Sequence, residues 1–263
     1  MPSSRYYKFK EVHHKEKIKK LKILLLSVTG FFLCLSIIWL FLISSLFKIK
    51  DIHIISDSTY LNRDDILKTI SSIAPLGLSK NLLILSKFRL KSELAASFPA
   101  ITDITIGKDL FHTLIVSFKK RIPIGIWCDI TRCYYFDKEG IVFADAPQTE
   151  GSLILKITDL SKSNVSLSDK VLDSGRINFV INFSDNINKL DTFKILEFKI
   201  NPNPSVDFEA ITNKNWSIYL DDRQDPALAV SNLLTILDEA VKNTGNIEYI
   251  DLRIPSRIFY KLK

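Results

Sequence analysis

Hydrophobic positions form one continuous run near the start of the chain and short periodic segments after it. Residues 23–47 contain no charged side chain, and as a helix they would measure ~38 Å against about 30 Å for the hydrocarbon core of a bilayer. A cleaved signal peptide has a shorter apolar region that ends in small residues, whereas this run ends in Ser-Leu-Phe-Lys. The pattern therefore predicts an uncleaved transmembrane helix over residues 23–47.

Strand-like and helix-like periods follow one another directly after this run. Residues 48–55 alternate apolar and polar positions, as a strand does. Two short helices are predicted next, with Asn62 as N-cap of the first and Ser86 as N-cap of the second. Because proline cannot continue a helix, Pro75 and Pro99 end them. Two alternating runs then meet at a turn, and we expect the helices to cover the apolar faces of the strands.

The remainder of the chain mixes short strands with two longer helices. A hairpin is predicted at Asp137-Lys138-Glu139-Gly140, since glycine can adopt the positive φ that such a turn requires. Strands and helices of these lengths place the chain in the α+β class. The other predicted elements are helices over residues 176–190 and from Pro226 onward, and strands over residues 193–200, 205–211 and 215–221.

Positive charge is concentrated before the apolar run. Residues 1–22 carry eight Lys or Arg and two Glu, a net charge of +6, and subtracting this from the whole-chain +7 leaves +1 for the rest. The positive-inside rule therefore predicts that the N-terminus lies in the cytoplasm and that residues 48–263 lie outside. The basic tail suits contact with the lipid bilayer, whereas the nearly neutral outer part carries no electrostatic footprint for nucleic acid.

Of the three cysteines, Cys34 lies in the apolar run and two lie outside it. Cys128 and Cys133 flank Asp-Ile-Thr-Arg between two strand-like runs, so the pair can form a short-loop disulfide across the strands in an oxidising compartment. The alternative is a pair of reduced residues in a sheet. Two thiols without a histidine nearby make a poor zinc site.

No residue pattern in the chain is typical of catalysis. His53 and His112 have no Gly-Xaa-Ser-Xaa-Gly elbow, paired carboxylates or His-Xaa-Xaa-Xaa-His spacing beside them. The acidic groups of residues 63–65 and 221–225 suit turns and helix starts better than a metal site. The eight glycines form no cluster that could cradle a phosphate. We therefore expect no enzyme activity, no cofactor, no metal and no small-molecule substrate.

The last residues alternate as a strand does. A strand at a chain end tends to border a sheet, where its unpaired N–H and C=O groups can accept a strand from another protein. The alternative is that neighbouring segments of the same chain cover this strand and that it binds nothing. In the predicted strand Ile258, Tyr260 and Leu262 share one side, and Arg257, Phe259 and Lys261 share the other.

The order and spacing of several motifs resemble the bacterial cell-division family FtsQ/DivIB, from the N-terminal tail to the last residues. The resemblance implies a cytoplasmic tail (1–22), an anchor (23–47), a POTRA domain of β-α-α-β-β order (48–120) and a β-rich domain with a mixed sheet and flanking helices (121–263). Lys120-Arg121-Ile122-Pro123 stands where the family often has Glu-Arg-Xaa-Pro. The matching motifs are Asp65 and Ile66, Gly77, Asn81-Leu82-Leu83, Phe98-Pro99-Ala100-Ile101, Leu114-Ile115-Val116, the Asp137–Gly140 turn and the terminal Tyr249-Ile250-Asp251-Leu252-Arg253.

The resemblance implies a non-enzymatic scaffold of the cytoplasmic (inner) membrane at the division septum, which recruits and positions septal wall-synthesis proteins. In the family the partner FtsB, carried with FtsL as a membrane-anchored coiled coil, docks along the last strand by β-strand addition. Arg253 can pair with a carboxylate of the partner or, internally, with Asp251 or Asp222. The residues that the resemblance puts at the contact are Arg253, Ile254, Ser256, Ile258, Phe259, Tyr260 and Leu262.

Two other functions are considered beside the scaffold. A membrane-anchored POTRA chaperone or assembly factor for exported polypeptides would need a separate barrel partner, because this chain has no room for a large transmembrane barrel. A cell-wall hydrolase would need a catalytic site that the motifs do not indicate.

Overall fold

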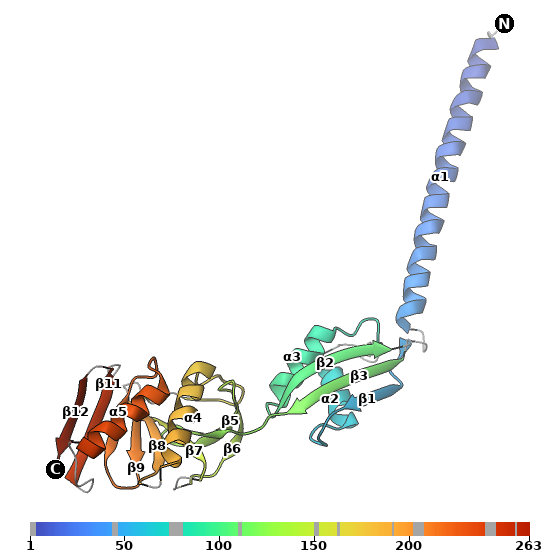
Figure 1. The fold of residues 1–263 in the computed structure, drawn as a ribbon. Helices are drawn as coiled ribbons and strands as arrows, with labels where there is room; N and C mark the ends of the chain where they lie inside the picture. The colour runs from blue at the N-terminus through green and yellow to red at the C-terminus, as the bar shows by residue number, and fades with distance from the viewer. Residues whose placement is uncertain are drawn as a thin grey trace. The chain divides into compact units, whose positions relative to one another are not determined.

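The computed structural model describes residues 4–43, 47–73, 81–109, 112–149, 153–161, 164–190, 192–201, 208–239, 246–255 and 257–263. Tertiary contacts divide the chain into two units, Met1–Leu94 with Ile104–Phe118, and Ala95–Asp103 with Lys119–Lys263. The structure is of mixed α+β class, as predicted, with an apolar N-terminal helix, a small sheet with two helices and a large β-rich sheet (Figure 1).

The first element, α1, is a helix over Ser4–Ile43. Its stretch Lys19–Phe41 is long and apolar enough to cross a membrane, as an anchor or as a signal sequence, and none of it is buried in the protein. Of the predicted span, residues 23–43 lie in α1, and residues 44–46 lie outside the described residues; Phe47, its last residue, lies outside α1 and is only 8% exposed. Its ring packs 5.4 Å from that of Phe41. Hydropathy alone does not distinguish an apolar side chain in lipid from one buried in protein.

A three-stranded sheet in the order β1-β3-β2 follows, with β1 parallel to β3. The helices α2 and α3 accompany it, and each turns a buried apolar stripe inward, Ile66 and Ile70 on α2 and Leu90 and Leu94 on α3. The elements are β1 (Asp51–Ile55), α2 (Arg63–Ile73), α3 (Lys87–Ser97), β2 (Ile101–Asp109) and β3 (Thr113–Lys120).

The predicted N-caps of these two helices are confirmed. The Asp65 N–H donates to Asn62 Oδ1 at 2.9 Å, and the Asn62 N–H donates back to Asp65 Oδ2 at 3.2 Å, a reciprocal capping box. The Arg89 N–H donates to Ser86 Oγ at 3.3 Å. The predicted end of the first helix at Pro75, and the family motif residue Gly77, lie outside the described residues.

The second unit is built on a nine-stranded mixed sheet in the order β12-β11-β10-β9-β8-β7-β4-β5-β6. The pairs β4–β7, β7–β8 and β10–β11 are parallel and the others are antiparallel. The elements are β4 (Gly125–Cys128), β5 (Cys133–Phe136), β6 (Val142–Ala146), β7 (Leu155–Asp159), α4 (Ser174–Asn188), β8 (Ile195–Ile200), β9 (Phe208–Thr212), β10 (Ser217–Leu220), α5 (Pro226–Glu239), β11 (Ile247–Ile254) and β12 (Arg257–Leu262).

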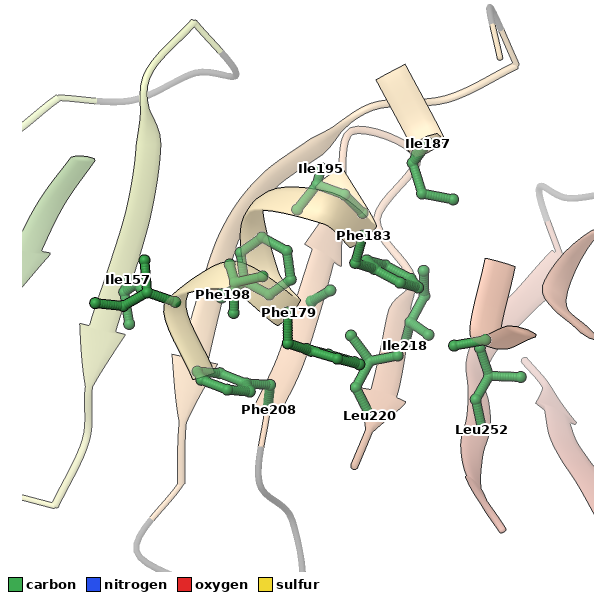
Figure 2. Packing of buried hydrophobic residues seen from close by; sticks show 14 of the residues in the cluster. Ile157, Phe179, Phe183, Ile187, Ile195, Phe198, Phe208, Ile218, Leu220 and Leu252 are labelled. Atoms are coloured by element: carbon green, nitrogen blue, oxygen red, sulfur yellow. The ribbon is translucent and has the colours of Figure 1, made fainter. Parts of the chain in front are cut away.

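One apolar core lies between this sheet and the helices α4 and α5. Phe183 of α4 packs edge-on against Phe198 of β8, with ring centroids 6.4 Å apart, and Phe198 packs in the same way against Phe208 of β9. Figure 2 shows these rings with Phe179, Ile218 and Leu220 between the helix and the strands. All three packed rings are fully buried, so this face of the sheet excludes water.

The predicted hairpin turn at Asp137 is confirmed, and it connects the antiparallel strands β5 and β6 of the large sheet. Asp137 Oδ1 accepts hydrogen bonds from the N–H groups of Glu139 and Ile141, at 2.9 and 3.0 Å, and the other carboxylate oxygen accepts from the Arg121 guanidinium. Arg121 Nε also donates to Pro99 O at 3.0 Å. The Arg121 and Asp137 side chains are only 12% and 8% exposed, so each charge depends on the other to offset its desolvation.

Gly140 completes this turn with φ of 80°, and a Cβ atom there would lie 1.9 Å from Leu172 O. We predict that Gly140→Ala lowers the free energy of unfolding by about 1–3 kcal/mol, through backbone strain and displacement of the Leu172 carbonyl. The measurement is thermal unfolding of the detergent-solubilised chain, followed by the fluorescence of the buried Trp127 and Trp216.

The matched control is Gly175→Ala, near the start of α4, where an added Cβ atom meets nothing within 4 Å. A glycine in a helix costs roughly 0.5–1 kcal/mol relative to alanine, so this second variant should be slightly more stable than the parent chain. Equal stability of the two variants would contradict the role given to the turn.

Candidate partner-binding edge

The strand β12 is the outermost strand of the large sheet, as its place at the chain end predicts. It pairs antiparallel with β11, and its partners include Ile250 opposite Tyr260 and Asp251 opposite Phe259. The register shifts at two points along the hairpin. Among the described residues, no backbone hydrogen bond reaches the outer side of β12, so this side presents N–H and C=O groups to solvent.

The opposite border of the sheet is partly covered by the chain itself. The Val142 N–H, at the start of β6, donates to Asp169 O at 3.0 Å, and Val142 O accepts from the Ser168 N–H at 2.8 Å. Ile141 forms an antiparallel bridge with Lys170 just before β6. Among the borders formed by the described residues, β12 alone is free along its full length for a backbone strand to add to this sheet.

The side chains of β12 alternate between the two faces of the sheet as predicted. Ile258 is half-buried and packs on the core beneath the helices, and Tyr260 lies beside the fully buried Ile250 on the same face. Phe259 lies beside Asp251 on the face without helices. The predicted contact residues with large exposed apolar side chains are Ile254 (47%), Phe259 (50%), Tyr260 (42%) and Leu262 (50%); Ser256 lies outside the described residues.

Arg253 pairs internally with Asp251, which was one of the partners that the sequence left open. Arg253 Nε donates to Asp251 Oδ1 at 2.8 Å, and a terminal guanidinium nitrogen donates to Oδ2 at 2.5 Å. Burial raises the pKa of Asp251, but the hydrogen bonds and positive charge of Arg253 outweigh it and hold the pKa below its ordinary value. The other predicted partner, Asp222, instead accepts from Arg176 on α4.

An aromatic surface adjoins this ion pair on the face without helices. The rings of Tyr219 and Tyr249 lie 5.1 Å apart on neighbouring strands, and the Arg253 guanidinium carbon lies 5.5 Å from the Tyr219 ring centroid. Burial, followed by the charge of Glu209, raises the pKa of Tyr219, which therefore stays neutral at physiological pH. The arrangement presents flat aromatic groups and one cationic group on this face of the sheet.

Two contacts that sequence reasoning missed hold the end of β11 in place. The side-chain nitrogen of Gln224 donates to Leu252 O at 3.1 Å and to Arg253 O at 2.6 Å. Asn232 Nδ2 of α5 donates to Pro255 O, in the turn before β12, at 3.3 Å. The only sequence signal was the polar segment 221–225, which indicated a turn and gave no sign of its distant partners.

The two outer cysteines lie away from this edge, on β4 and β5. Cys128 and Cys133 are joined by a disulfide, with their Cα atoms 4.0 Å apart. They form a small buried cluster with Ile126, on which Tyr135 and Ala146 pack. Within the described residues, no group of three or more His, Cys, Asp or Glu side chains is arranged to hold a metal ion.

No protein-family model matches the chain, and no curated protein matches it in a sequence search.

The Arg253–Asp251 pair gives a pH-dependent prediction. The folded pKa of Asp251 is depressed, so the pair's contribution is fully present above the ordinary carboxyl pKa of about 4 and is lost as the pH falls through the folded value. We predict that Asp251→Asn lowers stability at pH 7 by at most about 1 kcal/mol, because the pair is partly exposed, and that the difference disappears in strong acid.

The measurement is thermal unfolding of the parent chain and the variant between pH 7 and pH 2. Asp57→Asn, which removes an exposed carboxylate of the first unit, is the control and should follow the parent chain. An Asp251→Asn effect that grows as the pH falls would contradict the assigned ion pair.

Proposed function

We propose that the chain is a non-enzymatic, membrane-anchored scaffold of the bacterial cell-division machinery, of the FtsQ/DivIB kind, which recruits and positions septal wall-synthesis proteins. The observation that carries the proposal is the free border of β12 with its exposed apolar side chains. An open strand edge accepts another chain through main-chain hydrogen bonds, and the alternate side chains select which chain it is.

The proposed location is the cytoplasmic (inner) membrane at the division septum. The apolar stretch of α1 supports a single-pass anchor, and the +6 charge of residues 1–22 supports an N-terminus in the cytoplasm with both units outside. The Cys128–Cys133 disulfide fits that orientation, since disulfides persist in oxidising compartments.

The small sheet and its helices are proposed to be a POTRA domain that serves as a docking module. The order strand, helix, helix, strand, strand supports this assignment, and the arrangement β1-β3-β2 leaves a second strand edge at β2. The helices cover the apolar strand faces that the sequence predicted would need cover.

The proposed ligand of β12 is an extended segment of an FtsB-like protein, carried with an FtsL-like protein as a coiled coil. Phe259, Tyr260 and Leu262 offer the large apolar contacts that dominate such interfaces. Arg257 and Lys263 are exposed, and Lys261 Nζ forms an ion pair with Glu248 at 2.9 Å. Because the edge is basic, an acidic or neutral partner strand suits it better than a basic one. Arg253 would hold the end of β11 in place through its ion pair with Asp251, and its positive charge would add to the preference for an acidic partner strand.

The proposal predicts that the double variant Phe259→Ala, Tyr260→Ala weakens capture of the FtsB-like partner by at least about 30-fold, the effect of losing one interface hot spot. Cells that depend on the variant should grow as filaments because septation fails. The measurements are pull-down of the partner by the full chain from solubilised membranes and microscopy of the dividing cells.

The control is Phe88→Ala, which removes an aromatic side chain that is 81% exposed in the first unit. It should leave capture unchanged, and both proteins should unfold at the temperature of the parent chain. Undiminished capture by the β12 variant, together with normal division, would refute the proposed function.

A further inference from the structure

A short loop of the first unit is tied to the end of α1. Asn81 is only 3% exposed, and its Nδ2 donates to Phe41 O, in the last turn of the apolar helix, at 3.2 Å. The neighbouring Leu82 N–H donates to Phe47 O at 2.7 Å, and Asn81 forms an antiparallel bridge with Lys48. The loop is thus bonded to the chain on both sides of the point where α1 ends.

The loop divides its side chains between the protein and the solvent. Leu82 and Leu85 are each 4% exposed and anchor it in the unit, whereas Leu83 is 57% and Ile84 39% exposed. The Leu83 N–H donates to Asn81 Oδ1 at 2.9 Å, and the Leu85 N–H donates to Asn81 O at 3.1 Å. The same Asn81 that binds α1 therefore shapes the turn that holds two large aliphatic groups away from the core.

Lysines surround this loop. Lys108 Nζ donates to Leu85 O at 2.6 Å. Lys48, which forms the bridge with Asn81, and Lys87, which follows the loop in sequence, are both exposed. Burial lowers the pKa of Lys108, and repulsion by the positive charge of Lys87 lowers it further. A phosphate between them would relieve that repulsion.

The position of the loop determines which partner suits it. If α1 spans the membrane, the nineteen residues from Ile23, the first after the basic tail, to Phe41 make about 28 Å of helix against a hydrocarbon core of about 30 Å, so the Phe41 carbonyl lies close to its outer limit. Because the Asn81 side chain hydrogen-bonds to this carbonyl, the loop places Leu83 and Ile84 at the boundary between acyl chains and headgroups. Amphipathic surfaces bind there by burying apolar groups about 5–10 Å deep beside basic ones that face lipid phosphates.

We propose that the segment Asn81–Leu85 is a lipid-binding loop: Leu83 and Ile84 insert at the headgroup boundary, and the adjacent lysines contact phosphates of anionic lipids. The inference depends on the membrane anchor of the proposed function and goes beyond it. With α1 it gives the first unit a second attachment to the bilayer, which restricts how that unit can turn about the end of the helix.

The test places a bimane fluorophore on single cysteines of the full chain in vesicles of phosphatidylcholine and phosphatidylglycerol that contain a spin-labelled lipid quencher. Leu83→Cys, in a Cys34→Ser background, reports on the loop. Its matched control is Ile55→Cys in the same background, since Ile55 is 60% exposed in the same unit but lies at the far end of β1, five strand residues or about 16 Å beyond Lys50. The parent chain labelled at Cys34 reports on α1.

We expect quenching at position 83 to exceed that at position 55 by about twofold or more, as suits a group inserted at the headgroup boundary. The excess should fall when Lys87→Ala is added or when phosphatidylglycerol is omitted. Strong quenching at Cys34 with equal, weak quenching at positions 83 and 55 would overturn the lipid-binding loop and leave the anchor intact. No quenching at Cys34 would instead refute the anchor itself.

Two further outcomes would also overturn the inference. Equal, strong quenching at positions 83 and 55 would indicate that the whole unit adsorbs to the membrane. A bimane signal at position 83 that changes with protein concentration in lipid-free detergent would assign Leu83 to a contact between two copies of the chain.

Discussion

The large sheet depends on the burial of one of its faces beneath α4 and α5. The edge-to-face rings of Phe183, Phe198 and Phe208 exclude water from that face and hold strands from distant parts of the sequence in one layer. The other face has no helix, and its side chains satisfy one another by pairing across strands instead. Glu197 accepts from Thr158 and pairs with Lys156 and Lys199, while Glu209 accepts from Asn201 and Ser217. This face is apolar at two places, at the disulfide cluster of β4 and β5 and, with aromatic rings, near β12.

The ion pair at the end of β11 limits what Arg253 can do for a partner. Because Asp251 accepts two hydrogen bonds from its guanidinium group and the Tyr219 ring lies 5.5 Å from it, Arg253 is held in one place before any partner arrives. Less side-chain entropy is lost on binding when such a group is fixed in advance. The same ion pair weakens the attraction of Arg253 for a second carboxylate, so the proposed selectivity of this edge rests mainly on the exposed apolar side chains of β12.

Local features of the fold could be predicted from the sequence, whereas contacts between distant segments could not. The capping box of Asn62 and Asp65, the Gly140 turn and the outermost place of the last strand all depend on residues within a few positions of one another. The parallel pairing of β4 with β7 could not be predicted in this way, because the two strands lie some 30 residues apart. The choice of Asp251 over Asp222 for Arg253 likewise depended on Arg176, which reaches Asp222 from α4. After α1, the ring of Phe47 packs against that of Phe41, and the Phe47 carbonyl accepts a hydrogen bond from the Leu82 N–H; no period in the sequence connects these residues.

The two outer strands of the nine-stranded sheet differ in how much of their edge is free, and this limits how many strands the sheet can add. Since the start of β6 is bonded to the chain's own segment 168–171, the sheet can lengthen by a full strand on one side alone. On the proposed function the large sheet would accept a single extended segment, and two molecules that met through their last strands would close as a twofold pair with no full border of that sheet left over. The large sheets of successive molecules therefore cannot add edge to edge, head to tail, into an open filament. Any larger array would have to form through the first unit or the membrane.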